Sequence, residues 1–324
     1  LFLLRKSLTS SILVDKKISH TKMSGEVEPA SELTPELRAF VEFVAKKGCE
    51  LYRDLPWRRT YDPYAIWISE VMLQQTQVSR VDGRWQRWLE RFPTVDALAA
   101  AAPSDVLEEW QGLGYNRRAL SVHRAAQAIS EAGGVFPQDP KELVKLPGIG
   151  PATAAGIRAF AFNLHGVYLE TNVRTVFLHE LYPQAEGVPD SELVPLVELT
   201  CPASVADAAG ADETELTPRS WYYALLDYGA YLKKTIPNPS RRSKSHVKQS
   251  RFEGSHRQKR AELLRVLLAH KDEGGAVFET LHQELCQIEV NAGRETLDEQ
   301  VTLGLLEELA KEGFCQKNDE YWLP

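Results

Sequence analysis

Residues 140–176, PKELVKLPGIGPATAAGIRAFAFNLHGVYLETNVRTV, contain the stretch that decides the fold. The sequence predicts helices at 141–146 and 152–162, joined by a Pro- and Gly-rich string that can form only a tight turn. This pattern is a helix-hairpin-helix. Gly148 and Gly150 would let a partner approach the backbone, and the unpaired N–H groups at the start of the second helix suit a phosphate. An ordinary αα-hairpin with a glycine turn is the alternative.

Two groups of polar residues accompany the hairpin. The string Glu-Thr-Asn at 170–172 follows it, and a carboxylate beside a phosphate anchor favours chemistry on nucleic acid over packing alone. Upstream, the sequence predicts one helix over 63–78, on which Glu70, Gln74 and Gln77 share a face. That face is either solvated or forms the wall of a pocket.

The remaining sequence predicts a mainly α protein. Strand signals are almost absent from the domain that we expect at 31–235, and Pro or Gly turns separate its further helices, which we place at 34–53, 84–92, 95–101, 104–111, 117–131 and 219–232. Three more helices, at 258–269, 276–286 and 297–311, and a hairpin that turns at 318–319 predict a winged-helix-like module at 256–324. Such modules bind DNA or protein, and the Glu-rich third helix suits a DNA groove poorly.

Composition limits the class of protein. The 324 residues suggest about two domains, and 43% hydrophobic with 26% charged residues is ordinary for a globular chain. We expect residues 1–30 to be a disordered leader, with Met23 as the true start. Four cysteines, Cys49, Cys201, Cys286 and Cys315, have no metal-ligand spacing, and no apolar run approaches a membrane span. A cytoplasmic protein is therefore expected, without a membrane or metal partner.

Charge is distributed unevenly along the chain. The net charge of −7 argues weakly against nucleic acid, yet residues 233–260 hold ten Lys or Arg against one acid, Glu253. Within this strip we expect a basic segment at 236–255. Its residues Arg241, Arg242 and Lys244 either neutralise DNA phosphates or belong to a solvated linker.

Several motifs together carry a resemblance to a known family. IWISEVMLQQTQV at 66–78, GLGYNRRA at 112–119, LPGIGPATAAGIRAFAF at 146–162 and ETNVRTV at 170–176 resemble the helix-hairpin-helix DNA glycosylases, in particular the A/G-specific adenine glycosylases. The resemblance covers about 34–235. It implies a two-lobed helical glycosylase fold followed by the winged-helix-like module.

The resemblance also assigns roles to residues. It implies that Glu70 is the general acid that protonates the departing adenine, and that Glu170 with Asn172 stabilises the sugar cation. It places Gln74 and Gln75 at the lesion, and it makes Tyr115 and Asn116 candidate wedge residues; a capped turn with surface arginines is the alternative for their loop. Gly148, Gly150 and Thr153 would hold the phosphate at the hairpin, where we also allow for a monovalent cation.

Three departures from the family pattern bear on the chemistry. Glu170 stands where the family carries Asp, so the sugar-side carboxylate is one methylene longer. The cysteines that usually bind a four-iron cluster are missing, which implies a clusterless subgroup. The 8-oxoguanine-reading domain of the family has no counterpart in 256–324. Bifunctional relatives place a Schiff-base Lys where this chain has Ala152.

These observations predict a monofunctional, monomeric DNA glycosylase of a bacterial-type cell, acting at the nucleoid. Its expected substrate is double-stranded DNA with adenine mispaired with G or 8-oxoguanine. A glycosylase for another base and a non-catalytic DNA-binding protein are the alternatives, and the pair of carboxylates favours an enzyme.

Overall fold

The structure, a computed structural model, describes residues 33–205, 215–246 and 251–324. This part of the chain is mainly helical with one small sheet, which confirms the predicted fold class. The chain divides into two compact units: Leu1–Tyr61 with Arg158–Val247, and Asp62–Ile157 with Lys248–Pro324. Each unit therefore joins segments that lie far apart in the sequence. The expected leader at 1–30, including Met23, lies outside the described residues.

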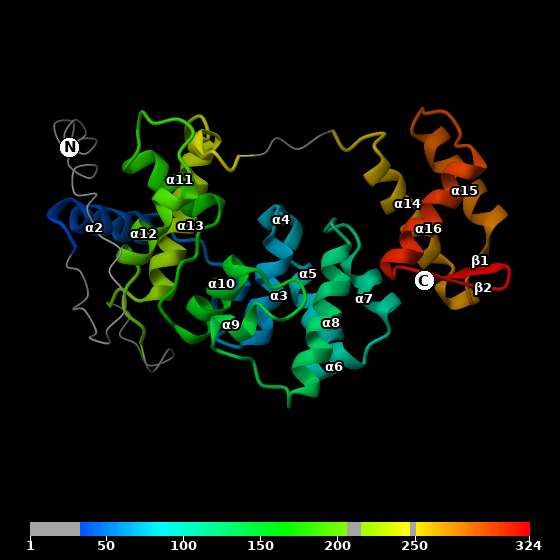
Figure 1. The fold of residues 1–324 in the computed structure, drawn as a ribbon, viewed down its shortest axis with the longest axis horizontal. Coiled ribbons are helices and arrows are strands. Elements are labelled where there is room, and N and C mark those ends of the chain that lie inside the picture. Colours follow the sequence, from blue (N-terminus) through cyan, green and yellow to red (C-terminus); the bar gives the residue numbers. More distant parts are fainter. Residues whose placement is uncertain (1–32, 206–214, 247–250) are drawn as a thin grey trace, which may run out of the picture. The chain divides into compact units, whose positions relative to one another are not determined.

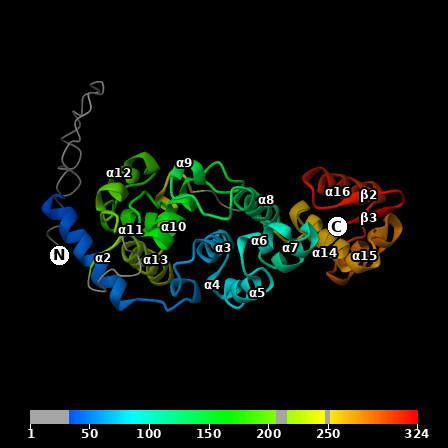
Figure 2. The ribbon, with the colours of Figure 1, turned by 90° about the horizontal axis from the view of Figure 1, so that it is seen from below.

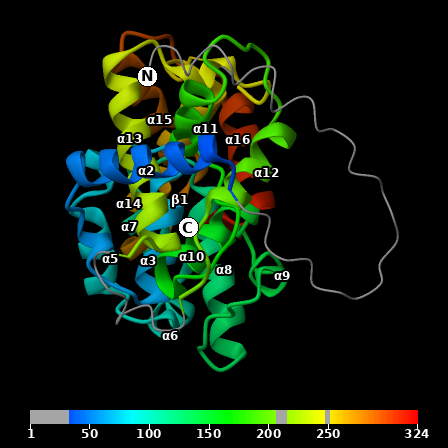
Figure 3. The same ribbon diagram turned by 90° about the vertical axis from the view of Figure 1, so that its left-hand side faces the viewer.

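The first unit is built around one aromatic helix. Its elements are α2 (Pro35–Glu50), η2 (Pro56–Arg58), the end of α10 (Pro151–Phe162), α11 (Thr171–Glu180), α12 (Asp190–Thr200), α13 (Pro218–Thr235) and η3 (Pro239–Arg242). Thr34 caps α2 through its side chain, as the sequence predicts. Helix α13 packs against α11 and α2 (Figures 1 and 3). It buries Trp221 and Tyr222 completely.

Two glycines allow α13 to approach its neighbours closely. A Cβ on Gly48 of α2 would lie 2.3 Å from the Cβ of Ala224, and a Cβ on Gly229 of α13 would lie 2.3 Å from the carbonyl oxygen of Asn172. No side chain fits at either crossing. The second crossing fixes the start of α11, where the polar residues 170–172 lie.

The same helix carries a buried ion cluster. Asp227 is 2% exposed and accepts two hydrogen bonds from the Arg58 guanidinium, at 2.7 and 2.8 Å. Arg53 donates a third from its Nε, at 2.5 Å. Because both arginines precede η2 or lie in it, the cluster fastens the chain after α2 to α13, and a buried carboxylate without these partners would be costly.

The second unit begins with a set of short helices. They are α3 (Pro63–Leu73), α4 (Val78–Val81), α5 (Arg84–Arg91), α6 (Val95–Ala100), α7 (Pro103–Trp110), α8 (Arg117–Glu131), α9 (Pro140–Leu143) and the start of α10. Helices α6 and α7 both pack against α8 (Figure 2). Trp67, Trp88 and Trp110 are fully buried between these elements.

The C-terminal module belongs to this second unit. It consists of α14 (His256–Ala269), η4 (Lys271–Glu273), β1 (Ala276–Val277), α15 (Phe278–Asn291), α16 (Glu299–Glu312), β2 (Gln316–Asn318) and β3 (Tyr321–Leu323). The antiparallel strands have the order β1-β3-β2, with Trp322 opposite Ala276 and Lys317. The module thus combines three α-helices with a three-stranded antiparallel sheet. Residues 276–277, predicted as helix, are instead its first strand.

Ion pairs join the module to the helices before it. The Lys271 ammonium lies 2.9 Å from Asp105 and 2.8 Å from Glu108 of α7, and Arg91 contacts the same two carboxylates. A second link joins α8 to α16, because Arg117 pairs with Glu312. Within residues 33–205, 215–246 and 251–324, no helix has the length and apolar character to cross a membrane.

Candidate active site

The predicted helix over 63–78 is broken, and the break shapes the surroundings of Glu70. Helix α3 ends at Leu73, and Gln75 adopts a left-handed backbone with φ of 54°. Gln77 is the N-cap of the next helix, α4. The prediction that Glu70, Gln74 and Gln77 share one face of a single helix is therefore wrong. Glu70 itself lies in the last turn of α3 and is partly buried.

Arg118 of α8 stabilises this break. The Arg118 guanidinium donates to the carbonyl oxygens of Val71 and Gln74, at 2.6 and 2.7 Å, and to that of Gly114, at 3.0 Å. These bonds satisfy carbonyls at the end of α3 that a continued helix would use itself. Burial lowers the pKa of Arg118 to about 10. Arg118 is therefore a scaffold residue that joins α3 to the 113–116 loop.

The side chain of Gln74 connects Glu70's helix to the hairpin. Its Nε2 donates to the Oγ1 of Thr153, at 3.0 Å, and Thr153 is 8% exposed. Thr153 was predicted to contact DNA, but its hydroxyl already accepts this bond and is buried. The structure thus gives Thr153 a positioning role beside its predicted one. Gln75 is exposed.

The hairpin has the geometry that the glycines predict. Its first helix is shorter than expected, because α9 ends at Leu143. Gly148 has φ of 76°, and a Cβ there would lie 2.7 Å from that of Ser121. Gly150 is exposed, with no atom within 4 Å of the place where its Cβ would lie. Ile149 between them is buried. At Gly148 the turn therefore packs closely against Ser121 of α8. At Gly150 its backbone is open, so a phosphate could approach there.

The 113–116 loop presents an aromatic ring at the surface. Tyr115 adopts φ of 51° and is 44% exposed, while Leu113 is buried. The centre of the Tyr115 ring lies 5.3 Å from the Arg118 guanidinium, which makes a cation–π contact with it. Asn116 follows at the N-cap of α8, without a capping bond from its side chain. A strained backbone that exposes a large ring is a geometry typical of a functional loop.

Glu170 is the N-cap of α11 in the first unit. Its Oε1 accepts hydrogen bonds from the backbone N–H groups of Asn172, at 2.5 Å, and Val173, at 3.1 Å. The longer side chain therefore folds back to its own helix. The buried Oδ1 of Asn172 has no hydrogen-bond partner, which leaves an acceptor next to this carboxylate.

Opposing effects act on the Glu170 carboxyl group. Burial raises its pKa, whereas Lys233 of α13 and the two backbone donors favour the carboxylate. Burial also lowers the pKa of the Lys233 ammonium. The sequence analysis counted Lys233 only as part of the basic strip. Glu70 and Glu170 belong to different units, and their approach in the active enzyme stays a prediction.

Part of the basic segment is packed rather than extended. Pro239 and Ser240 in η3 are buried, and η3 packs against α11. The Arg242 guanidinium donates to the carbonyl oxygens of Leu178, Tyr182 and Ala185. This packing argues against the alternative of a solvated linker for Arg242. Arg241 and Lys244 are exposed, whereas 247–250 lie outside the described residues.

The positions of the four cysteines do not suit the four-iron cluster that is usual in the family. Cys49 and Cys201 lie in the first unit, on α2 and after α12, whereas Cys286 and Cys315 lie in the C-terminal module. Among the residues that the structure describes, no three His, Cys, Asp or Glu side chains come close enough to hold a metal ion. No step of the chemistry is therefore assigned to iron.

Comparison with known proteins agrees with this fold and these motifs. Residues 68–217 match the family described as HhH-GPD superfamily base excision DNA repair protein. An adenine DNA glycosylase of Mycolicibacterium smegmatis is 37% identical over 223 residues, which cover 66% of this chain and 75% of that protein. An adenine DNA glycosylase of Mycobacterium tuberculosis is 36% identical over 234 residues, with shares of 67% and 75%. The chain belongs to the HhH-GPD superfamily.

The fold comparison points the same way. The structure of a thermostable thymine-DNA glycosylase superposes with a TM-score of 0.52, at 22% identity, over 63% of this chain and 90% of that one. At this identity the likeness concerns the fold alone. It confirms a helix-hairpin-helix glycosylase fold.

Proposed function

We propose that this protein is a DNA N-glycosylase of base excision repair that removes adenine from double-stranded DNA. The observation that carries the proposal is the 37% identity, over 223 residues, to an adenine DNA glycosylase. The family match over 68–217 includes both Glu70 and Glu170. The opposing base is taken as G or 8-oxoguanine, and the enzyme is taken to act as a monomer on the DNA of a bacterial-type cell.

Glu70 is the general acid of the proposed reaction. The target adenine must leave the base stack before any side chain can reach its glycosidic bond. As that bond breaks, its electron pair moves to the purine nitrogen, and a proton from the Glu70 carboxyl group neutralises the leaving base. Glu70 lies in the last turn of α3 and is only partly buried, so its carboxyl group can be reached by a base that has left the stack.

Glu170 supports the sugar side of the same step. Positive charge develops on the sugar as adenine departs, and a nearby carboxylate lowers the energy of that state. The backbone bonds from Asn172 and Val173 hold the longer side chain in one place. A water molecule then adds to the sugar carbon and gives its proton to the Glu70 carboxylate left by the first step, which restores the acid and leaves an abasic site. No iron is assigned to these steps, and we propose that activity does not require it.

The proposal is tested with Glu70→Gln, which removes the proton donor and keeps the shape of the side chain. We expect the single-turnover excision rate to fall about 100-fold or more, while DNA affinity stays within about tenfold. Glu90→Gln is the matched control, because Glu90 is an exposed glutamate of α5 in the same unit. Substrates should include A opposite 8-oxoguanine, A opposite G, U opposite G and oxidised pyrimidines.

Each outcome decides between the alternatives. Release of adenine by the wild type and its loss in Glu70→Gln support the proposal. Release of uracil or an oxidised pyrimidine but not of adenine indicates a glycosylase for another base. Binding without release from any duplex indicates a DNA-binding protein, and wild-type rates in Glu70→Gln remove this residue from the mechanism.

A further inference from the structure

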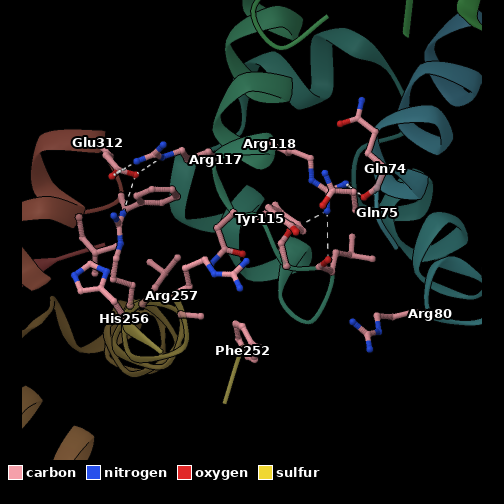
Figure 4. A pocket seen from close by; sticks show the side chains of 18 residues that line it. Gln74, Gln75, Arg80, Tyr115, Arg117, Arg118, Phe252, His256, Arg257 and Glu312 are labelled. Carbon is pink, nitrogen blue, oxygen red and sulfur yellow. Dashed lines mark hydrogen bonds and ion pairs between the residues drawn. The ribbon is translucent and has the colours of Figure 1, made fainter. Parts of the chain in front are cut away.

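The second unit contains a groove between the 113–116 loop and the C-terminal module. Its volume is about 730 Å³, which lies in the range of sites that hold ligands. Gln75, Arg80 and Tyr115 line it from the side of the short helices, whereas Phe252, which precedes α14, and Arg257, at the start of α14, line it from the other side (Figure 4). The groove thus continues the surface that carries the predicted wedge residues.

Most of the charged side chains that line the groove are cations. The charged residues of the lining, with its one histidine, are Arg80, Arg117, Arg118, His256, Arg257, Arg260 and Glu312. The one acid among them is already neutralised, because Glu312 lies 2.5 Å from Arg117 and 2.8 Å from Arg260, which hold its pKa at about 2. Arg80 and Arg257 are both exposed. The lining therefore favours an anion, although the whole chain carries a net charge of −7.

Exposed aromatic rings stand at this groove beside the cations. Tyr115 is 44% exposed and Phe252 is 50% exposed, and both line it. The Arg257 guanidinium lies 6.0 Å from the Phe252 ring. Aromatic faces next to arginines are the combination that binds a nucleic-acid strand, since bases stack on the rings while phosphates meet the cations.

We propose that this groove binds a strand of the DNA substrate and that the C-terminal module contacts DNA with the start of its first helix. Arg257 and Arg80 meet phosphates, and Phe252 meets a base or sugar of the same strand. The Glu-rich helix α16, which a winged helix would place in a DNA groove, instead contributes Glu312 to the ion pairs that hold the module in place. This inference rests on the proposed function, from which it takes its partner.

The experiment measures binding to an undamaged duplex by fluorescence anisotropy over a range of salt concentrations. Arg257→Ala should weaken binding and reduce the salt slope by about one unit, because one phosphate contact is lost. Phe252→Ala should weaken binding about fivefold or more with an unchanged slope, because a stacking surface is lost without a charge. Arg265→Ala is the matched control: Arg265 lies on the same helix, is exposed and does not line the groove.

The control separates a groove contact from general electrostatics. Equal effects of Arg257→Ala and Arg265→Ala, or unchanged binding in both Arg257→Ala and Phe252→Ala, would overturn the proposal and leave the groove to another kind of partner. Because an undamaged duplex offers no base for excision, the result does not depend on adenine removal. A failure of the proposed function appears only in the excision assay with Glu70→Gln.

Discussion

Lys233 is the cation with the larger effect on the proposed sugar-side carboxylate, Glu170, and Arg174 acts in the same direction. The charge of Lys233 lowers the pKa of Glu170, against the larger effect of burial, which raises it. The proposed mechanism requires the carboxylate form of Glu170, so the excision rate should rise with pH through the Glu170 pKa, which lies above the usual value of a glutamate. The hydrogen bonds from the backbone N–H groups of Asn172 and Val173 hold the Glu170 carboxyl group in this buried position.

Lys233→Met should therefore change the pH dependence of excision. Without the ammonium group the pKa of Glu170 rises further, and the acidic limb of the single-turnover pH profile moves to higher pH. Lys234→Met is the control, because Lys234 is the exposed neighbour on α13 and is not among the charges that shift the pKa of Glu170. Identical acidic limbs in wild type and Lys233→Met would show that Glu170 does not govern this limb.

At the scale of elements, the two arginines of η3 have different tasks. Arg242 fastens η3 to the end of α11 through the carbonyl oxygen of Leu178 in the last turn and that of Tyr182 just beyond it, and its charge suits the negative end of the helix. Arg241, its neighbour, is exposed. One residue therefore belongs to the packing and the other is available to a phosphate.

The pair can be separated by measurement. Arg242→Ala should lower the free energy of unfolding by about 1–3 kcal/mol, seen as a fall of a few degrees in melting temperature. Arg241→Ala should leave the melting temperature unchanged and reduce the salt slope of DNA binding by about one unit. A melting temperature that falls equally in both variants would contradict this division.

These elements also show which parts of the fold could be predicted from the sequence. The caps and turns predicted the helices well, because Thr34 and the Gly-rich string at 112–114 act locally. The break after Leu73 could not be predicted, since it depends on Arg118, which lies more than forty residues further along the chain. The packing of η3 could not be predicted for the same reason. A segment of Pro, Ser and Arg is typical of a linker, and only the fold shows that Arg242 donates to carbonyl oxygens at the end of α11.

At the scale of the whole molecule, the two units do not follow the order of the chain. The predicted boundaries at 235 and 256 follow changes in composition, whereas the C-terminal module shares a unit with residues 62–157. That grouping depends on contacts such as Lys271 with Asp105 and Glu108, which periodicity cannot reveal. The candidate catalytic residues were within reach of the sequence because they lie in contiguous motifs, whereas the groove at Phe252 and Arg257 required the fold.

The product that the whole enzyme leaves on DNA follows from one position in the hairpin. A glycosylase that also cleaves the strand attacks the sugar with an amine, which forms a covalent imine with the enzyme. Ala152 stands at the place where the resemblance puts that lysine. The nearest lysines before it in sequence are Lys141 and Lys145 on the other side of the turn, and Lys145 is paired with Glu142 at 2.7 Å. Water is therefore the expected nucleophile.

We accordingly expect an intact abasic strand as the product. After excision of adenine, the DNA should remain uncut on a denaturing gel and should break only after treatment with hot alkali, which shows that the base has been removed. Borohydride, which reduces an enzyme–DNA imine to a stable bond, should trap no adduct. Glu70→Gln serves as the control, because it should give no break even with alkali. Strand cleavage without alkali, or an adduct trapped by borohydride, would show that an amine of this chain attacks the sugar.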